Sequence, residues 1–207
     1  MGLMAKESGG DFEKPPEGVY NAVCTKIIDL GMQESSYAGV TSLKRKVLIE
    51  WEIADEKRSN GEPFTVASRY TLSLSKNAQL RKVLQSWRGR AFTAEELAGF
   101  DLEKVLGAPC QLQIVHTEAN NGNTYANVDA IMPLAKGSPK PQPSGELLIY
   151  SCDEPDPDVL AKLSEKMGDI VTTGQHRLAE QNGTAYADQR PDPQRGDHGE
   201  IEDSIPF

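Results

Sequence analysis

The stretch from Leu43 to Glu56 alternates apolar and charged side chains at almost every step. The apolar residues fall on one face and the charged residues on the other: Val47, Ile49, Trp51 and Ile53 against Lys46, Glu50 and Glu52. A period of two is that of a β-strand, in which successive side chains point to opposite faces. A strand with one apolar face needs a second layer to cover that face. The stretch therefore predicts a sheet with one face buried in a core.

Four further segments read as strands, and a helical stretch separates them into two groups. The strands are predicted over Gly18 to Met32, Phe64 to Leu74, Gln111 to Thr117 and Thr124 to Pro133, with Gln33 to Ser42 as a loop. Between the third and fourth strands the apolar period changes to that of a helix, over Lys76 to Trp87. Thr93 and Glu96 then match a capping box that begins a shorter helix.

This order of elements predicts a mostly β fold. Five strands with a helical insert between strands three and four are typical of the OB-fold, a five-stranded Greek-key barrel. Periodicity by itself equally permits another small barrel or an α+β sheet. Trp51, Tyr70 and Trp87 share the phase of apolar neighbours, which favours the core over a surface role.

The chain divides into five predicted regions. They are a flexible arm (1–16), the OB-fold domain (17–135), a Pro-rich linker (136–145), a strand and helix extension (146–180) and a disordered acidic tail (181–207). Asp156 and Pro157 form a helix start within the extension. The tail is rich in polar residues and is almost without apolar ones until Ile201.

The net charge of −9 is unevenly distributed. Residues 1–135 contain 15 Lys and Arg against 17 Asp and Glu, whereas residues 136–207 contain 7 against 14. The excess of acid therefore belongs largely to the C-terminal third. A nearly neutral body can still carry a basic stripe, and the local potential steers an anionic partner.

Several functional classes lack support in the sequence. There is no phosphate-binding loop, no nucleophile elbow and no dinucleotide fingerprint, so we expect no enzyme and no cofactor. Cys24, Cys110 and Cys152 are far apart, which argues against a zinc site, and we expect no metal. The acidic run from Asp153 to Asp158 is better explained as a helix start. Without a signal peptide or a long apolar run, we expect a cytoplasmic protein that does not contact membranes.

A nucleic-acid surface needs cations for phosphates and aromatic faces for unstacked bases. The candidates are Tyr37, Lys44, Arg45, Lys46, Arg69 and Tyr125. The cations lie where the first loop enters the second strand and on the third strand, which is the ligand face of OB-folds. The alternatives stay open: a solvated strand entry for the cations and half-buried loop residues for the tyrosines. Arg81, Lys82, Arg88 and Arg90 give the helical insert a basic side that either widens this surface or is merely solvated.

The last residues combine acid with large apolar side chains: Asp203, Ile205, Pro206 and Phe207. Fully burying one such side chain is worth roughly 1.5–3 kcal/mol, so we expect this tip to bind a partner's pocket. The tip resembles that of bacterial single-stranded DNA-binding proteins, although Ser204 interrupts the acidic run.

Other stretches resemble phage and prophage single-stranded DNA-binding proteins. They are Leu106 to Cys110 with Val115-His116, Gly122 to Val128, Ile131 to Leu134, and Leu148-Ile149-Tyr150 with the helix that follows. The resemblance implies an OB-fold that coats single-stranded DNA without sequence preference in replication, recombination or repair. It also implies a tail that recruits bacterial replication and repair enzymes. Because residues 146–180 intervene before the tail, the oligomeric state of the bacterial proteins is not carried over, and a homo-oligomer stays an open possibility.

The sequence leaves two alternatives to single-stranded DNA binding open. One is an OB-like adaptor that binds protein and does not contact DNA. A more distant one is a nuclease or another DNA-processing enzyme.

Overall fold

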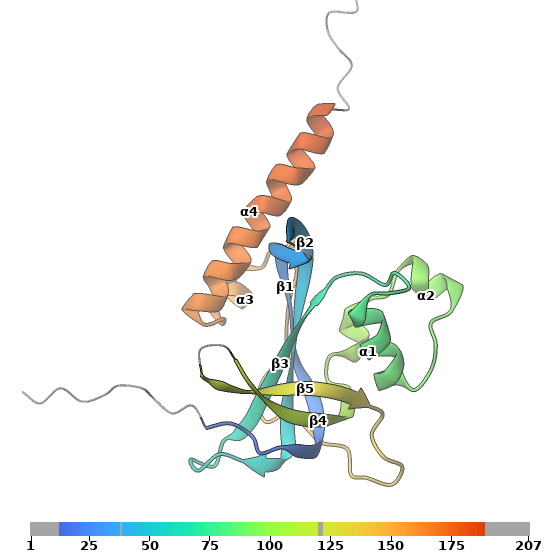
Figure 1. The fold of residues 1–207 in the computed structure, drawn as a ribbon, viewed down its shortest axis with the longest axis vertical. Coiled ribbons are helices and arrows are strands. Elements are labelled where there is room, and N and C mark those ends of the chain that lie inside the picture. The colour runs from blue at the N-terminus through green and yellow to red at the C-terminus, as the bar shows by residue number, and fades with distance from the viewer. Residues whose placement is uncertain (1–12, 38, 120–121, 189–207) are drawn as a thin grey trace, which may run out of the picture.

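The computed structural model describes residues 13–37, 39–119 and 122–188. The chain is mostly β, as predicted, with six strands in one sheet. They are β1 (Gly18–Tyr37), β2 (Val40–Lys57), β3 (Pro63–Thr71), β4 (Pro109–Glu118), β5 (Thr124–Met132) and β6 (Leu148–Tyr150). The first five follow the order β3-β2-β1-β4-β5 and pair antiparallel (Figure 1). The sixth, β6, pairs parallel to β1.

The helical insert lies between β3 and β4, where the sequence placed it. It consists of α1 (Gln79–Arg88), α2 (Ala94–Ala98) and the 3-10 helix η1 (Leu102–Val105). The predicted capping box of α2 is confirmed, because Thr93 and Glu96 exchange hydrogen bonds with each other's backbone. The sequence predicted a helix from Lys76, but α1 begins at Gln79. Its N-cap residue is Ala78, and no side chain caps the helix.

The main core lies between the strands and α1. Trp51, Tyr70 and Trp87 are buried in it, as predicted, and the two tryptophan rings lie 5.8 Å apart between centroids. Trp87 Nε1 donates a hydrogen bond of 3.0 Å to Pro109 O, which ties α1 to the start of β4. Cys24 and Cys110 are buried here, and burial raises the pKa of the Cys24 thiol to about 12.

The predicted loop over Gln33 to Ser42 is wrong. β1 runs to Tyr37 and β2 begins at Val40, with a register that pairs Gln33 with Lys44 and Tyr37 with Val40. Ser36 Oγ and Thr41 Oγ1 are 2.8 Å apart across this hairpin. The end of the hairpin is mostly exposed, so its strands need no apolar alternation, and periodicity could not reveal them.

β3 and β5 form the two ends of the sheet path. Within the described residues no strand pairing joins them, so the sheet is open at this point. Each of the two strands therefore keeps one edge that no other described strand covers.

The C-terminal extension consists of β6, α3 (Pro157–Ala161) and α4 (Glu165–Asp188). Asp156 caps α3 and Pro157 occupies its first turn, which confirms the predicted helix start. α4 continues to Asp188, so the expected disorder from residue 181 is wrong for residues 181–188. The remaining tail, residues 189–207, lies outside the described residues.

The extension covers the outer face of β1 and β2, the face that points away from the main core (Figure 1). Leu48 lies between Val47 and Ile49 on β2, yet it packs in a second apolar cluster with Ile28 and Val171. Alternation along a strand explains how one strand serves both clusters. No helix among the described residues is long and apolar enough to cross a membrane.

Candidate functional site

Two adjoining clefts lie between the facing edges of β3 and β5. The larger, about 480 Å³, is lined by Thr65–Ala67 of β3 and by residues 123–126. The smaller, about 330 Å³, is lined by Ala67–Tyr70 and by residues 127–129 and 131, with α1 beside it. Because they share Ala67 and continue along the same two strands, we treat them as one feature, the β3–β5 seam.

Tyr125 is the exposed aromatic residue of the seam. It is 49% exposed and lies on β5, opposite Thr117 of β4. Lys14 and Arg58 line the same cleft. Lys14 Nζ donates a hydrogen bond of 2.9 Å to Thr124 O, and the Arg58 guanidinium lies 5.7 Å from the centroid of the Phe64 ring. The structure thus places two cations in the same cleft as the aromatic residue that the sequence singled out.

Lys14 reaches the seam because the end of the expected arm is held against the body. Glu13 accepts hydrogen bonds from the Ser59 backbone N and from Ser59 Oγ, which lower the pKa of its carboxyl. Pro15 O lies 2.8 Å from Nε2 of His116. Sequence reasoning missed Lys14 and Arg58, since one lies in a polar arm and the other beside a turn. The only signal for Lys14 was the Pro15-Pro16 pair, which restricts the backbone.

Arg69 lies on the outward face of β3 and lines the smaller cleft. Its neighbours on that face, Ala67 and Thr71, are small. Thr71 pairs with Lys46 of β2, and Lys46 Nζ donates a 3.0 Å hydrogen bond to Thr71 Oγ1. Lys46 and Arg69 therefore lie on neighbouring strands, as the sequence anticipated for these two cations, although Lys46 lines neither cleft of the seam. Lys44 is exposed on β2 opposite Gln33, at the hairpin end.

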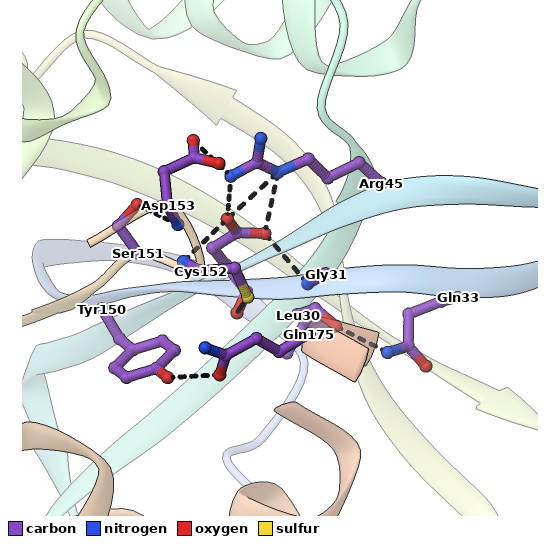
Figure 2. A network of polar contacts seen from close by, with 10 residues as sticks. Leu30, Gly31, Gln33, Arg45, Tyr150, Ser151, Cys152, Asp153 and Gln175 are labelled. Atoms are coloured by element: carbon purple, nitrogen blue, oxygen red, sulfur yellow. Dashed lines mark hydrogen bonds and ion pairs between the residues drawn. The ribbon is translucent and has the colours of Figure 1, made fainter. Parts of the chain in front are cut away.

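Arg45 has different partners from its neighbours Lys44 and Lys46, and Figure 2 shows the contacts of Arg45. Its guanidinium forms ion pairs with Asp29 and, at 2.7 Å, with Asp153 of the C-terminal extension. The hydrogen bonds to Asp29 raise the pKa of Arg45 further, so that the group stays charged. Asp29 also accepts hydrogen bonds from Gly31 N at 2.9 Å and Cys152 N at 3.1 Å. Arg45 thus joins β1, β2 and the extension, and we do not assign it to the seam.

The extension is held tightly beside this ion pair. A Cβ added to Gly174 of α4 would lie 1.9 Å from Leu30 O, so the two backbones touch. Gln33 Nε2 donates hydrogen bonds to Leu30 O at 2.6 Å and to Ile170 O at 3.1 Å. Tyr150 OH donates to Gln175 Oε1 at 2.9 Å (Figure 2). The outer surface of β1 and β2 is therefore occupied here, and the open surface lies toward β3.

Five of the predicted site residues cannot be placed with their side chains. Tyr37 is the last residue of β1, but its side chain lies outside the described part of the structure. The tip residues Asp203, Ile205, Pro206 and Phe207 also lie outside it.

Cations outnumber carboxylates along the seam. Lys14, Arg58 and Arg69 line its two clefts together with Glu13 and Asp129, and Lys46 extends the row of cations. In the portion of the chain that the structure describes, no cluster of His, Cys, Asp and Glu could hold a metal ion. Searches of protein-family models, curated proteins and solved structures found no match to this chain.

Proposed function

We propose that this chain binds single-stranded DNA along the β3–β5 seam, without sequence preference and without a catalytic step. The observation that carries the proposal is the half-exposed ring of Tyr125 beside Lys14 and Arg58 in one cleft. Aromatic rings stack on any base, and cations that follow the backbone contact any phosphate. This combination selects unpaired strands without reading their sequence.

The strand order supports an OB-fold as the framework of this proposal. In β3-β2-β1-β4-β5 the first strand is central, and the helical insert sits between β3 and β4. An OB barrel has this arrangement and closes where the third and fifth strands approach. The seam lies between these two strands, next to the β2–β3 surface that OB-folds use for oligonucleotides.

The acidic segment that ends in Asp203, Ile205, Pro206 and Phe207 has a separate proposed role. We infer that it binds replication, recombination or repair enzymes of a bacterial cell, through apolar side chains flanked by carboxylates. The support is its composition and its resemblance to the tips of bacterial single-stranded DNA-binding proteins. Deleting residues 203–207 should abolish capture of such enzymes while DNA affinity stays the same or rises.

Fluorescence anisotropy with labelled oligo-dT tests the DNA proposal. Each phosphate contact to a single strand contributes about −0.7 to the slope of log K against log salt. With about four contacts, affinity should fall by roughly 50-fold between 50 and 200 mM salt. Duplex of the same length should bind more weakly. Equal affinity for duplex, or binding that ignores salt, would overturn the proposal, and no binding at all would favour the protein adaptor.

A further inference from the structure

A third cleft of about 480 Å³ lies beyond the end of β5, outside the seam. It is bounded by the C-terminal end of α1, by η1 and by Pro133 and Leu134, which follow β5 directly. Arg88, Arg90 and Lys104 line it, with Glu96 as the single carboxylate among its lining residues. We call it the Arg88 cleft.

Arg88 is held in place by aromatic rings. Its guanidinium carbon lies 4.5 Å from the ring centroid of Phe92 and 4.8 Å from that of Phe100. Only 12% of its side chain is exposed. Nη2 is paired with Glu96, whereas Nη1 is buried and has no hydrogen-bond partner in the described structure. A buried donor without an acceptor is costly, and the two aromatic rings beside the guanidinium offset part of that cost.

The other two cations are more exposed. Arg90 is 55% exposed and donates to both Glu96 oxygens, at 2.7 and 3.1 Å. Lys104 is exposed, with Nζ 5.8 Å from the centroid of Phe100. The Arg90 contact and the Thr93 backbone lower the pKa of Glu96 to about 2, so one ionised carboxylate faces three cations. The further acids of the insert, Glu95, Asp101 and Glu103, are not among the residues that line the cleft.

The remaining walls of the cleft are apolar. They are formed by Val105, Ala108, Pro109, Pro133 and Leu134. A ligand that fills such a site carries an anionic group for the cations and an apolar or planar body for these walls. A nucleotide has both, as phosphate and as sugar with base. The cleft also lies one residue beyond β5, the strand that carries Tyr125 at its other end.

We propose that the Arg88 cleft is a second contact site for the bound single strand, in which the exposed Arg90 and Lys104 contact backbone phosphate and Arg88 adds its positive charge. The inference rests on the proposed function and extends it from the seam to the far end of β5. A strand that spans both sites must cover the length of β5, about 30 Å at the usual rise per residue. Short oligonucleotides that occupy only the seam should therefore not depend on the Arg88 cleft.

The test compares oligo-dT of about 4 and about 16 nucleotides, the range of site sizes for one OB-fold. The double variant Arg90→Gln with Lys104→Gln removes the two exposed cations. For the long oligonucleotide the salt slope should fall by about 1.4, because two phosphate contacts are lost. For the short one it should not change. Lys104→Gln alone should lower the long-oligonucleotide slope by about 0.7, and it leaves the Arg90–Glu96 ion pair intact.

The control is the double variant Lys140→Gln with Lys166→Gln, which changes the net charge equally at two exposed positions outside both sites. If wild type binds DNA and the cleft variants match this control, the Arg88 cleft is not a DNA contact, while the proposed function stands. If wild type binds neither oligonucleotide, both proposals fail. Polyglutamate that displaces the long oligonucleotide from wild type but not from the cleft variants would assign the cleft to an acidic peptide instead and overturn the inference.

Discussion

The outer surface of the sheet has a half that the C-terminal extension covers and a half that it leaves open. Over β1 and β2 it is covered by the C-terminal extension, which buries Leu48 and Val171 in a second apolar cluster. Over β3 and β5 it is open, and small residues alternate with Arg69 on β3 beside the seam. The covered half is closed by apolar packing and by backbone contact at Gly174. The open half offers cations and one exposed aromatic ring. Among the described residues, the extension therefore leaves the surface over β3 and β5 uncovered.

Consecutive residues of β2 also have different partners. Arg45 points to the ion pair with Asp29 and Asp153, whereas Lys46 contacts Thr71 beside Arg69. Side chains alternate between the faces of a strand, so a run of three cations cannot act as one patch. Arg45 therefore binds the extension through Asp153, whereas Lys46 contacts Thr71 of β3.

The covered half depends most strongly on the backbone contact at Gly174. Gly174→Val should destabilise the protein by about 3 kcal/mol, because the new Cβ meets the Leu30 carbonyl and both partners are backbone atoms. Urea denaturation measures this loss. Gly168→Ala in the same helix is the matched control, since its Cβ meets nothing within 4 Å, and it should be neutral or stabilising. Equal stability of the two variants would mean that α4 does not dock as described.

Removal of Arg45 tests the ion pair that joins β1, β2 and the C-terminal extension. Arg45→Met leaves Asp29, whose side chain is 8% exposed, without its counter-charge and should cost about 2–3 kcal/mol. Thiol labelling at pH 8 reports where the loss occurs. Burial raises the pKa of Cys152 to about 12, so this thiol should label slowly in wild type and faster in the variant. Cys24 and Cys110 in the main core should stay protected in both; if all three thiols label faster together, the variant unfolds globally.

The open half depends on Tyr125. Tyr125→Ala should weaken oligo-dT binding by about 1–2 kcal/mol, roughly 5- to 30-fold, because one stacking platform is lost. Tyr125→Phe is the control and should keep most of the affinity. Stability in urea should change little, since the ring is 49% exposed. Unchanged affinity in Tyr125→Ala would remove this residue from the site.

The smallest expected effect distinguishes the contribution of Lys46 to DNA binding from that of Arg45. Lys46→Gln should reduce the salt slope of DNA binding by about 0.7, the contribution of one phosphate contact. Arg45→Met should leave that slope unchanged, even if affinity falls because the hairpin moves. A reduced slope in Arg45→Met would show that Arg45 contacts phosphate, and the division between the two residues would be lost.

Sequence reasoning predicted the parts of the fold in which one face is apolar. An apolar periodicity indicated the five main strands, the insert and the place of Trp51 in the core. A capping residue, Asp156, indicated the start of α3. The hairpin end of β1 and β2 has no such signal, because its described residues are mostly exposed and exposed segments need no apolar pattern.

The site was harder to predict than the fold. Arg69 and Tyr125 could be chosen by residue type and strand position, and the structure brings both to the seam. Lys14 and Lys104 come from segments distant in sequence, so only tertiary packing places them. The role of Arg45 depends on Asp153, which is 108 residues away, and no local pattern could reveal that pair.

Photocrosslinking tests the central claim that the single strand lies in the β3–β5 seam. Wild-type protein would be irradiated with an oligonucleotide that carries bromodeoxyuridine at single positions, and the crosslinked peptides would be identified by mass spectrometry. The account predicts adducts on Tyr125 and on peptides that contain Thr65 to Arg69. Adducts confined to α4 or β6, with none on β3 or β5, would contradict it.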